Sequence, residues 1–211
     1  MTNFIPIFPL NIVVYPGEKL NLHIFEPRYK QLITECFAEA KPFGIIYASD
    51  NKINDYGTLV NINKIAAVYE DGKMDISTLG SRIFVVLEII KSLPNKLYSG
   101  AIVNYPDNAE YINLKMMSKI LKDVRQLHQL LNLTKDFKKP DEELTSYDIA
   151  HHVGLSVKEE YELLELLQES QRLEYIRRHL AKTIKVVLGV ENLKDKIKLN
   201  GHFRELEGFN F

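Results

Sequence analysis

The chain has 211 residues, of which 45% are hydrophobic and 26% are charged, enough to bury the core of one large domain or two smaller ones. Its formal net charge of −1 gives no overall attraction to nucleic acid or to an anionic membrane surface. No stretch approaches the roughly 18 uninterrupted apolar residues of a membrane-spanning helix.

The first residues predict short strands around a tight turn. "FIPIFPL" and "IVVYP" have strand composition, with prolines that belong at strand ends or sheet edges. In "YPGE", Pro16 suits the second turn position and Gly17 supplies the positive φ of the third. "LNLHIF" then alternates, so that Leu22 and Ile24 share one face of a strand and His23 lies on the other.

A helix is predicted from "EPRYKQLITECFAEA". Pro27 suits its first position and Glu26 can face the helix N-terminus, whereas Pro42 forces an end near Lys41. An apolar stripe at three- and four-residue spacing comprises Tyr29, Leu32, Ile33, Cys36, Phe37 and Ala40.

The following segments predict further strands, to a total of about six. They are "FGIIYA", "GTLVNINKIAAVYEDGKMDISTLG", "SRIFVVLEIIK" and "LYSGAIVNYP". Asp71-Gly72 lies between two alternating runs and predicts a hairpin with a two-residue turn.

From residue 110 the apolar period becomes helical. One face of "INLKMMSKILKDVRQLHQLLNL" carries Leu114, Met117, Ile120, Leu121, Val124, Leu127 and Leu131. Two capping boxes, Thr145 with Asp148 and Ser156 with Glu159, predict helix starts, and Ser170 is expected to cap a last, long helix. The apolar face of that last helix carries Leu173, Ile176, Leu180, Ile184 and Val187. We therefore expect an α+β protein, β-rich over residues 1–108 and helical over 109–211, joined at "YPDNA".

Motifs for catalysis are missing from the sequence. There is no phosphate-binding G-x-x-x-x-G-K-[ST], no G-x-G-x-x-G, no G-x-S-x-G and no H-E-x-x-H. The lone Cys36 lies at the wrong end of its helix for activation as a nucleophile, so we expect it in the core. Adjacent His151 and His152 point about 100° apart on a helix and cannot share a metal, so one should pack and the other meet water. We expect no enzyme activity, no cofactor and no metal.

Charge is uneven in the second half. Residues 141–170 hold nine acidic residues, and residues 171–198 hold eight basic residues against three acidic ones. The basic run either binds nucleic acid or complements the neighbouring acidic helix. The apolar tail "GHFRELEGFNF", residues 201–211, either docks on the body or occupies a groove on a neighbouring molecule.

The sequence resembles a known family. "FPLNIVVYPGEKLNLHIFEPRYKQLI" closely resembles the start of the Lon protease N-terminal, substrate-binding domain, and "GTLVNI" with "DGKMDISTLGSRIFVV" resembles its next hairpin. "SYDIAHHVGLSVKEEYELLELLQESQRLEYIRRHL" is similar to its helical part, so that the resemblance spans about residues 4–185. It implies a distorted β-barrel of the PUA-like kind with one inserted helix, followed by a helical bundle. It also implies a free-standing relative of that domain, without the ATPase and Ser-Lys peptidase domains of a full-length Lon protease.

These observations predict a non-enzymatic module that binds exposed or unfolded polypeptide segments or a protein partner, such as a Lon-type protease. The expected site is an apolar groove between the β and α parts, with candidate rim residues Tyr15, His23, Phe25, Glu26, Arg28 and Tyr29. His23 is either a hydrogen-bonded surface residue or a general base. Glu26 and Arg28 either fix how the helix enters the barrel or line the groove.

The alternative is an RNA-binding PUA-like protein, supported by the basic run and opposed by the near-neutral charge. The single cysteine and a proline-containing N-terminus without leading basic residues predict a cytoplasmic location.

Overall fold

Six strands and one helix make up the first half of the chain. The computed structural model describes residues 3–49, 52–109 and 113–206, with side chains described except at 191, 195 and 197–206. The strands are β1 (Asn3–Leu10), β2 (Lys19–Ile24), β3 (Phe43–Ser49), β4 (Lys52–Val68), β5 (Met74–Ile90) and β6 (Gly100–Asn104). Helix α1 (Pro27–Ala38) is inserted between β2 and β3. The predicted six strands with one inserted helix are confirmed.

The strands form one six-stranded sheet in the order β2-β5-β4-β3-β1-β6, and a further β5–β6 pairing closes most of it into an irregular barrel. The β1–β3 pair is parallel and the other pairs are antiparallel. Register shifts bend the long β4–β5 hairpin at three places. This closure leaves β2 outside the ring of paired strands, at an edge of the sheet.

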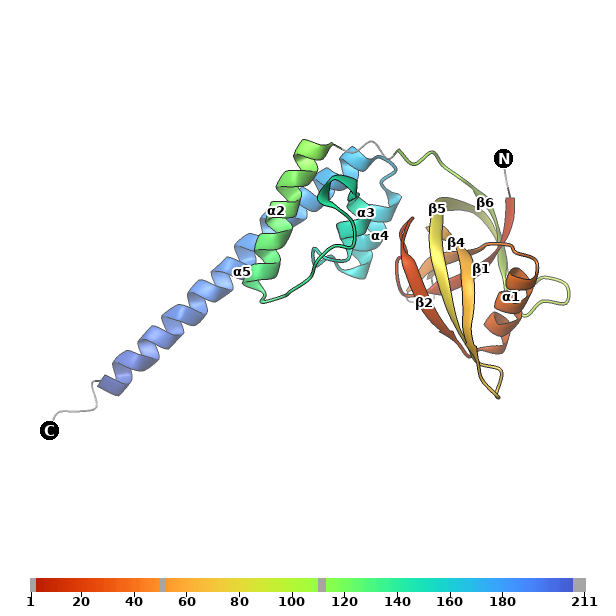
Figure 1. The fold of residues 1–211 in the computed structure, drawn as a ribbon, viewed down its shortest axis with the longest axis horizontal. Coiled ribbons are helices and arrows are strands. Elements are labelled where there is room, and N and C mark those ends of the chain that lie inside the picture. The colour runs from red at the N-terminus through yellow and green to blue at the C-terminus, as the bar shows by residue number, and fades with distance from the viewer. Residues whose placement is uncertain (1–2, 50–51, 110–112, 207–211) are drawn as a thin grey trace.

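Four helices follow, on one side of the barrel (Figure 1). They are α2 (Leu114–Leu130), α3 (Ser146–Ala150), α4 (Val157–Glu165) and α5 (Glu169–Leu206), with a short 3₁₀ turn, η1 (Asp141–Glu143). Both predicted capping boxes are present, at the starts of α3 and α4. Helix α5 runs away from the barrel, and its far half extends beyond the other helices (Figure 1).

Hydrophobic clusters join these elements. One lies between α1 and the sheet and includes the buried, unpaired Cys36, as expected. Burial raises the pKa of the Cys36 thiol to about 11, which keeps it protonated and unreactive. Another cluster holds the helices together and also contains Val13, Tyr15 and Ile83 from the β-rich half. The two halves of the molecule therefore share part of one core.

Several predicted boundaries are wrong. "IVVYP" is not a strand: it joins none of the described strand pairs, and the Val14 carbonyl accepts a hydrogen bond from the Thr58 side chain instead. Helix α1 ends at Ala38 rather than near Lys41.

The early end of α1 has a local cause. Ala40 has φ +50°, and the Lys41 and Ala40 amides donate to the carbonyls of Cys36 and Phe37, a left-handed cap that terminates the helix.

Other differences are smaller. "DISTLG" and "SRIFVVLEIIK" form one continuous strand, β5. The hairpin is at the predicted place, but its turn is longer: the Tyr69 amide donates to the Lys73 carbonyl, and of the Asp71-Gly72 pair Gly72 alone has positive φ. Leu114 and Leu131 are exposed at the ends of α2 instead of buried. Ser170 lies inside α5, which starts at Glu169. The predicted docking of tail residues 201–211 concerns side chains outside the described residues.

Candidate functional site

Two of the six predicted rim residues are buried. Tyr15 is 0% exposed: its ring lies 5.1 Å from that of Tyr147, and its hydroxyl donates to the Glu160 carbonyl at 2.9 Å. Burial, with the nearby Glu160 and Glu18 carboxylates, holds the pKa of Tyr15 far above its usual value. Tyr15 therefore joins the barrel to the helices, and its expected place on a groove rim is wrong.

Tyr29 is also in the core, with 5% exposure. Its ring stacks on Phe8 with centroids 3.8 Å apart, and burial raises the pKa of its hydroxyl. The Arg28 guanidinium covers the ring at 4.5 Å. The predicted rim position of Tyr29 is therefore wrong too, since the helix stripe turns it toward the sheet.

Of the other four predicted residues, Glu26 is partly buried and the rest are exposed, and two of these, His23 and Phe25, belong to one aromatic surface. His23, at the end of β2, lies 6.3 Å from the ring of Phe25 and 6.0 Å from that of Tyr69. Phe25 and Tyr69 are 58% and 47% exposed. We call His23, Phe25 and Tyr69 the corner surface. Exposed aromatic side chains gathered in this way mark an interaction site.

Hydrogen bonds hold the rings of the corner surface in place. His23 Nδ1 is 2.7 Å from Asp75 Oδ1, and the Tyr69 hydroxyl donates to Asp75 Oδ2 at 2.6 Å. These bonds, from Tyr69 first and then His23, lower the pKa of Asp75 below its usual value. In the described part of the chain no hydrogen bond reaches His23 Nε2. A fixed polar atom thus lies open beside exposed rings, as in many binding sites.

A shallow hollow of about 650 Å³ adjoins the corner surface, lined by His23 and the hairpin turn. The turn is anchored: Lys30 of α1 donates to the Asp71 carbonyl at 2.8 Å, and Lys73 pairs with the Asp71 carboxylate at 2.7 Å. The hollow is therefore lined by two segments far apart in sequence, β2 and the β4–β5 hairpin, and α1 anchors the hairpin turn.

Glu26 and Arg28 pair with each other at the start of α1. Arg28 Nε donates to Glu26 Oε2 at 2.8 Å, and Glu26 is the N-cap residue without a side-chain capping bond. The two charges therefore pair with each other at the first turn of α1, and no ion pair or hydrogen bond from either side chain to a described strand is found. They border the corner surface in sequence, directly after Phe25.

The groove expected between the β and α parts is closed where tyrosines meet. Tyr161 of α4 accepts hydrogen bonds from the Asp55 and Tyr56 amides at 3.2 and 3.1 Å, and its ring lies 5.3 Å from that of Tyr47. Together with Tyr15, these rings pack across the junction where the sequence predicted an open groove.

His151 adds a polar bridge to this junction. Its Nδ1 is 2.6 Å from Glu160 and its Nε2 is 3.1 Å from Glu18, which lies before β2. Burial alone would lower the pKa of His151, but the hydrogen bonds and charges of Glu160 and Glu18 outweigh it and raise the pKa to about 9. His151 is thus a cation between two carboxylates, one from each half. Its neighbour His152 packs on Phe137, with ring centroids 5.3 Å apart.

Comparison with known proteins identifies the fold and the family. A family model described as the ATP-dependent protease La (LON) substrate-binding domain matches residues 5–182. The chain belongs to the Lon substrate-binding domain family. The matched domain is named for binding substrate, so this Lon-type chain is a substrate-binding module.

Two solved structures share the fold. A Lon N-terminal domain protein from Xanthomonas campestris is 24% identical, with a TM-score of 0.63, over 83% of this chain and 98% of that one. The N-terminal domain of a Mycobacterium avium complex Lon protease is 14% identical, with a TM-score of 0.61, over 85% and 98%. At these identities the likeness establishes the fold, and the resemblance seen in the sequence is confirmed.

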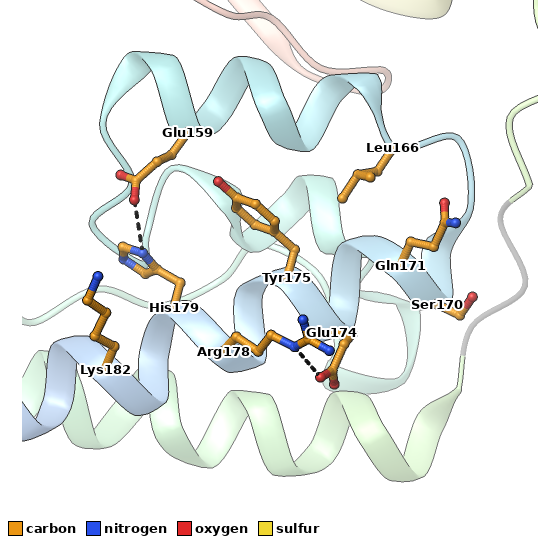
Figure 2. A pocket seen from close by; sticks show the side chains of 9 residues that line it. All are labelled: Glu159, Leu166, Ser170, Gln171, Glu174, Tyr175, Arg178, His179 and Lys182. Carbon is orange, nitrogen blue, oxygen red and sulfur yellow. Dashed lines mark hydrogen bonds and ion pairs between the residues drawn. The ribbon is translucent and has the colours of Figure 1, made fainter.

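A second concave surface of this Lon-type domain lies between α4 and α5 (Figure 2). It encloses about 710 Å³, and Tyr175 forms its floor beneath α4. Arg178 donates to Glu174 at 2.7 Å, and His179 lies 3.6 Å from Glu159, whereas Lys182 at the same groove has no such line drawn to it (Figure 2). The lining is mostly charged and polar, unlike the exposed rings of the corner surface.

The basic run of α5 is largely neutralised in its first turns. Arg172 is fully buried against Glu169 at 2.8 Å, whereas Arg177 and Arg178 both pair with Glu174 of their own helix. These pairs all lie within α5, and a contact that does join α5 to the acidic helix α4 is His179 with Glu159, at 3.6 Å. Among the helices that the structure describes, none is long and apolar enough to cross a membrane.

Sequence reasoning missed Tyr69 and Asp75. The signal for Tyr69 was present in "AVYEDGK", where this aromatic residue directly precedes the hairpin turn. That both residues meet His23 depends on the pairing of β2 with β5, in which His23 lies opposite Asp75.

Proposed function

We propose that the corner surface binds exposed, largely apolar segments of unfolded polypeptides, and that this serves ATP-dependent proteolysis by a Lon-type protease in the cytoplasm. The observation that carries the proposal is the pair of exposed rings, Phe25 and Tyr69, beside a His23 that is anchored by Asp75. Membership of a substrate-binding family supports a role in binding. Apolar segments are what an unfolded protein exposes and a folded protein hides.

The binding test uses a reduced, carboxymethylated model protein carrying a fluorescent label, with anisotropy as the readout. We expect Phe25→Ala and Tyr69→Ala each to weaken binding by about three- to tenfold, since an anchoring aromatic residue contributes about 1 kcal/mol or more. Leu87→Ala is the matched control, because Leu87 is 56% exposed but lies toward the other end of β5.

Equal affinity of the wild type and both corner variants would refute the proposed site. Absence of any binding by the wild type would refute the function itself.

The link to proteolysis has a separate test. We expect the purified domain to change the rate at which a full-length Lon protease degrades the same labelled protein, because both compete for or share its exposed segments. Phe25→Ala should reduce this effect in proportion to its lost affinity. An unchanged degradation rate at saturating domain would contradict the link.

The RNA-binding alternative gains no support from the family comparison. Of the basic run that suggested it, residues 171–198, the three arginines are engaged with Glu169 and Glu174, so the positive charge left exposed comes from the lysines of α5.

A further inference from the structure

Strand β2 is an open sheet edge beside the corner surface. It pairs with β5 alone, from Lys19 opposite Leu79 to Ile24 opposite Met74. Because the barrel closes through β5–β6, no strand among the described residues pairs with its other side. An unpaired strand edge is a template for another extended chain.

The turn before β2 fixes which backbone groups point outward. The Gly17 amide donates to the Gly80 carbonyl at 3.0 Å, and the Gly80 amide donates to the Glu18 carbonyl at 2.8 Å. With φ +80° at Gly17, this is a glycine β-bulge, and Glu18 faces β5. Gly80 admits no side chain here, because a Cβ would lie 2.2 Å from the Tyr15 carbonyl oxygen.

Hydrogen bonding alternates along an antiparallel pair, so every second residue after Glu18 also faces β5. The N–H and C=O groups of the residues between them point away from the sheet. Those outward residues are Lys19, Asn21 and His23, all exposed. Within the described ranges no hydrogen bond reaches these outward groups.

The apolar side chains of β2 are also incompletely covered. Leu20 and Leu22 face the core but remain only partly buried, packed at the margin of the cluster beneath α1. A further strand beside β2 would cover them with its own apolar residues at alternate positions. The corner surface lies at the far end of the same strand, where Phe25 follows Ile24.

We propose that the outer edge of β2 takes up an extended segment of the bound polypeptide as an added strand, which rests on the function proposed above. The preferred ligand is then a chain with apolar residues at alternate positions: its backbone pairs with Lys19, Asn21 and His23, and one face of its side chains covers Leu20 and Leu22. Main-chain hydrogen bonds supply affinity without a fixed sequence, as suits a binder of many unfolded proteins.

Asn21→Pro tests the pairing directly. Proline removes the outward N–H and fills the docking path, while the ladder to β5 is kept, because an edge strand tolerates proline where its N–H faces solvent. Asn21→Ala is the matched control, since it shortens the same side chain and keeps the N–H. With a short peptide of alternating valine and threonine flanked by lysines, we expect about tenfold or greater loss for Asn21→Pro and less than about twofold for Asn21→Ala.

Two measurements on the wild type keep the proposal testable if Asn21→Pro does not fold. N-methylation of alternate residues of the peptide should abolish binding in one register and spare it in the other. Peptide binding should also slow amide hydrogen exchange at Lys19, Asn21 and His23, and leave exchange in β6 unchanged.

The outcomes separate the two proposals. If the wild type and Asn21→Pro bind equally and both N-methylated peptides bind, strand addition is wrong while the function stands. If the wild type binds neither peptide nor unfolded protein, both fail. Protection of the three amides without ligand, in a dimer seen by sedimentation, would show that a second copy of β2 covers the edge, and would overturn the assignment to an unfolded chain.

Discussion

Two histidine–carboxylate clusters of the molecule differ in how completely they are satisfied. At the junction, both ring nitrogens of His151 form hydrogen bonds, one with Glu160 and one with Glu18, and the ring lies 4.9 Å from that of Tyr15. At the corner surface, His23 Nδ1 is hydrogen-bonded to Asp75, and Nε2 has no hydrogen bond in the described structure. Saturated polar groups hold a fold together, and unsaturated ones beside exposed rings remain available to a ligand. The following experiments test this distinction, from the largest expected effect to the smallest.

Arg172→Ala should cause the largest loss of stability. Its guanidinium is fully buried and donates to Glu169, Asn108 and the Leu166 carbonyl, so removal leaves the buried Glu169 carboxylate without its cation. We expect a loss of about 3–5 kcal/mol in the free energy of unfolding, measured by urea denaturation. The control Arg178→Ala, an exposed pair with Glu174, should cost less than about 1 kcal/mol. Equal losses for the two variants would contradict the role of the buried pair.

His151 should make stability depend on alkaline pH. Because its folded pKa is about 9 and its unfolded pKa lies near 6.5, the bridge contributes fully below pH 6.5 and is lost as pH rises through about 9. Because the His151 side chain is partly exposed, solvent screens its charge, and we expect the free energy of unfolding to fall by about 1–2 kcal/mol across this pH range. His151→Gln should flatten the profile. Parallel pH profiles for the variant and the wild type would rule out the bridge as the cause.

Tyr15→Phe should lower the free energy of unfolding by about 1 kcal/mol, because it removes the hydrogen bond to the Glu160 carbonyl and keeps the ring stacked on Tyr147.

The shared core predicts that residues 1–108 and 109–211 unfold together. Far-ultraviolet circular dichroism of the helices and methyl resonances of the barrel should therefore give coincident transitions. Separate transitions in the wild type would show that the halves are independent.

Phe25→Ala should leave the free energy of unfolding within about 0.5 kcal/mol of the wild type, since the ring is 58% exposed. The same change weakens ligand binding if the corner surface is the site. A destabilisation comparable to that of Tyr15→Phe would mean that Phe25 is part of the core rather than a binding residue.

The turn, strand face and helix start of the β2–α1 region could be predicted from nearby residues in the sequence. Pro16 and Gly17 predicted the turn, which is closed by the Glu18 amide donating to the Tyr15 carbonyl at 3.1 Å. Alternation predicted an outward His23, and Pro27 predicted the start of α1. Each of these depends on residues within a few positions of one another.

Contacts between residues far apart in the chain could not be predicted from the sequence. Tyr15 looked available because its partners in α3 and α4 lie more than 130 residues away, and the hydroxyl bond to Glu160 spans 145 positions. Tyr69 was overlooked because its meeting with His23 requires the β2–β5 register, and the His23–Asp75 bond spans 52 positions. The consecutive burial of Val13, Val14 and Tyr15 likewise arises from two different clusters packing on one short segment.

The bond from Lys30 to the Asp71 carbonyl has a consequence for the cost of recognition. A free hairpin turn would lose conformational freedom whenever a ligand settled on it, and that loss would be subtracted from affinity. Tethered to α1 at 2.8 Å, the turn is already ordered in the empty molecule. The entropy is given up once, during folding, and a ligand that settles on this turn would not have to order it again.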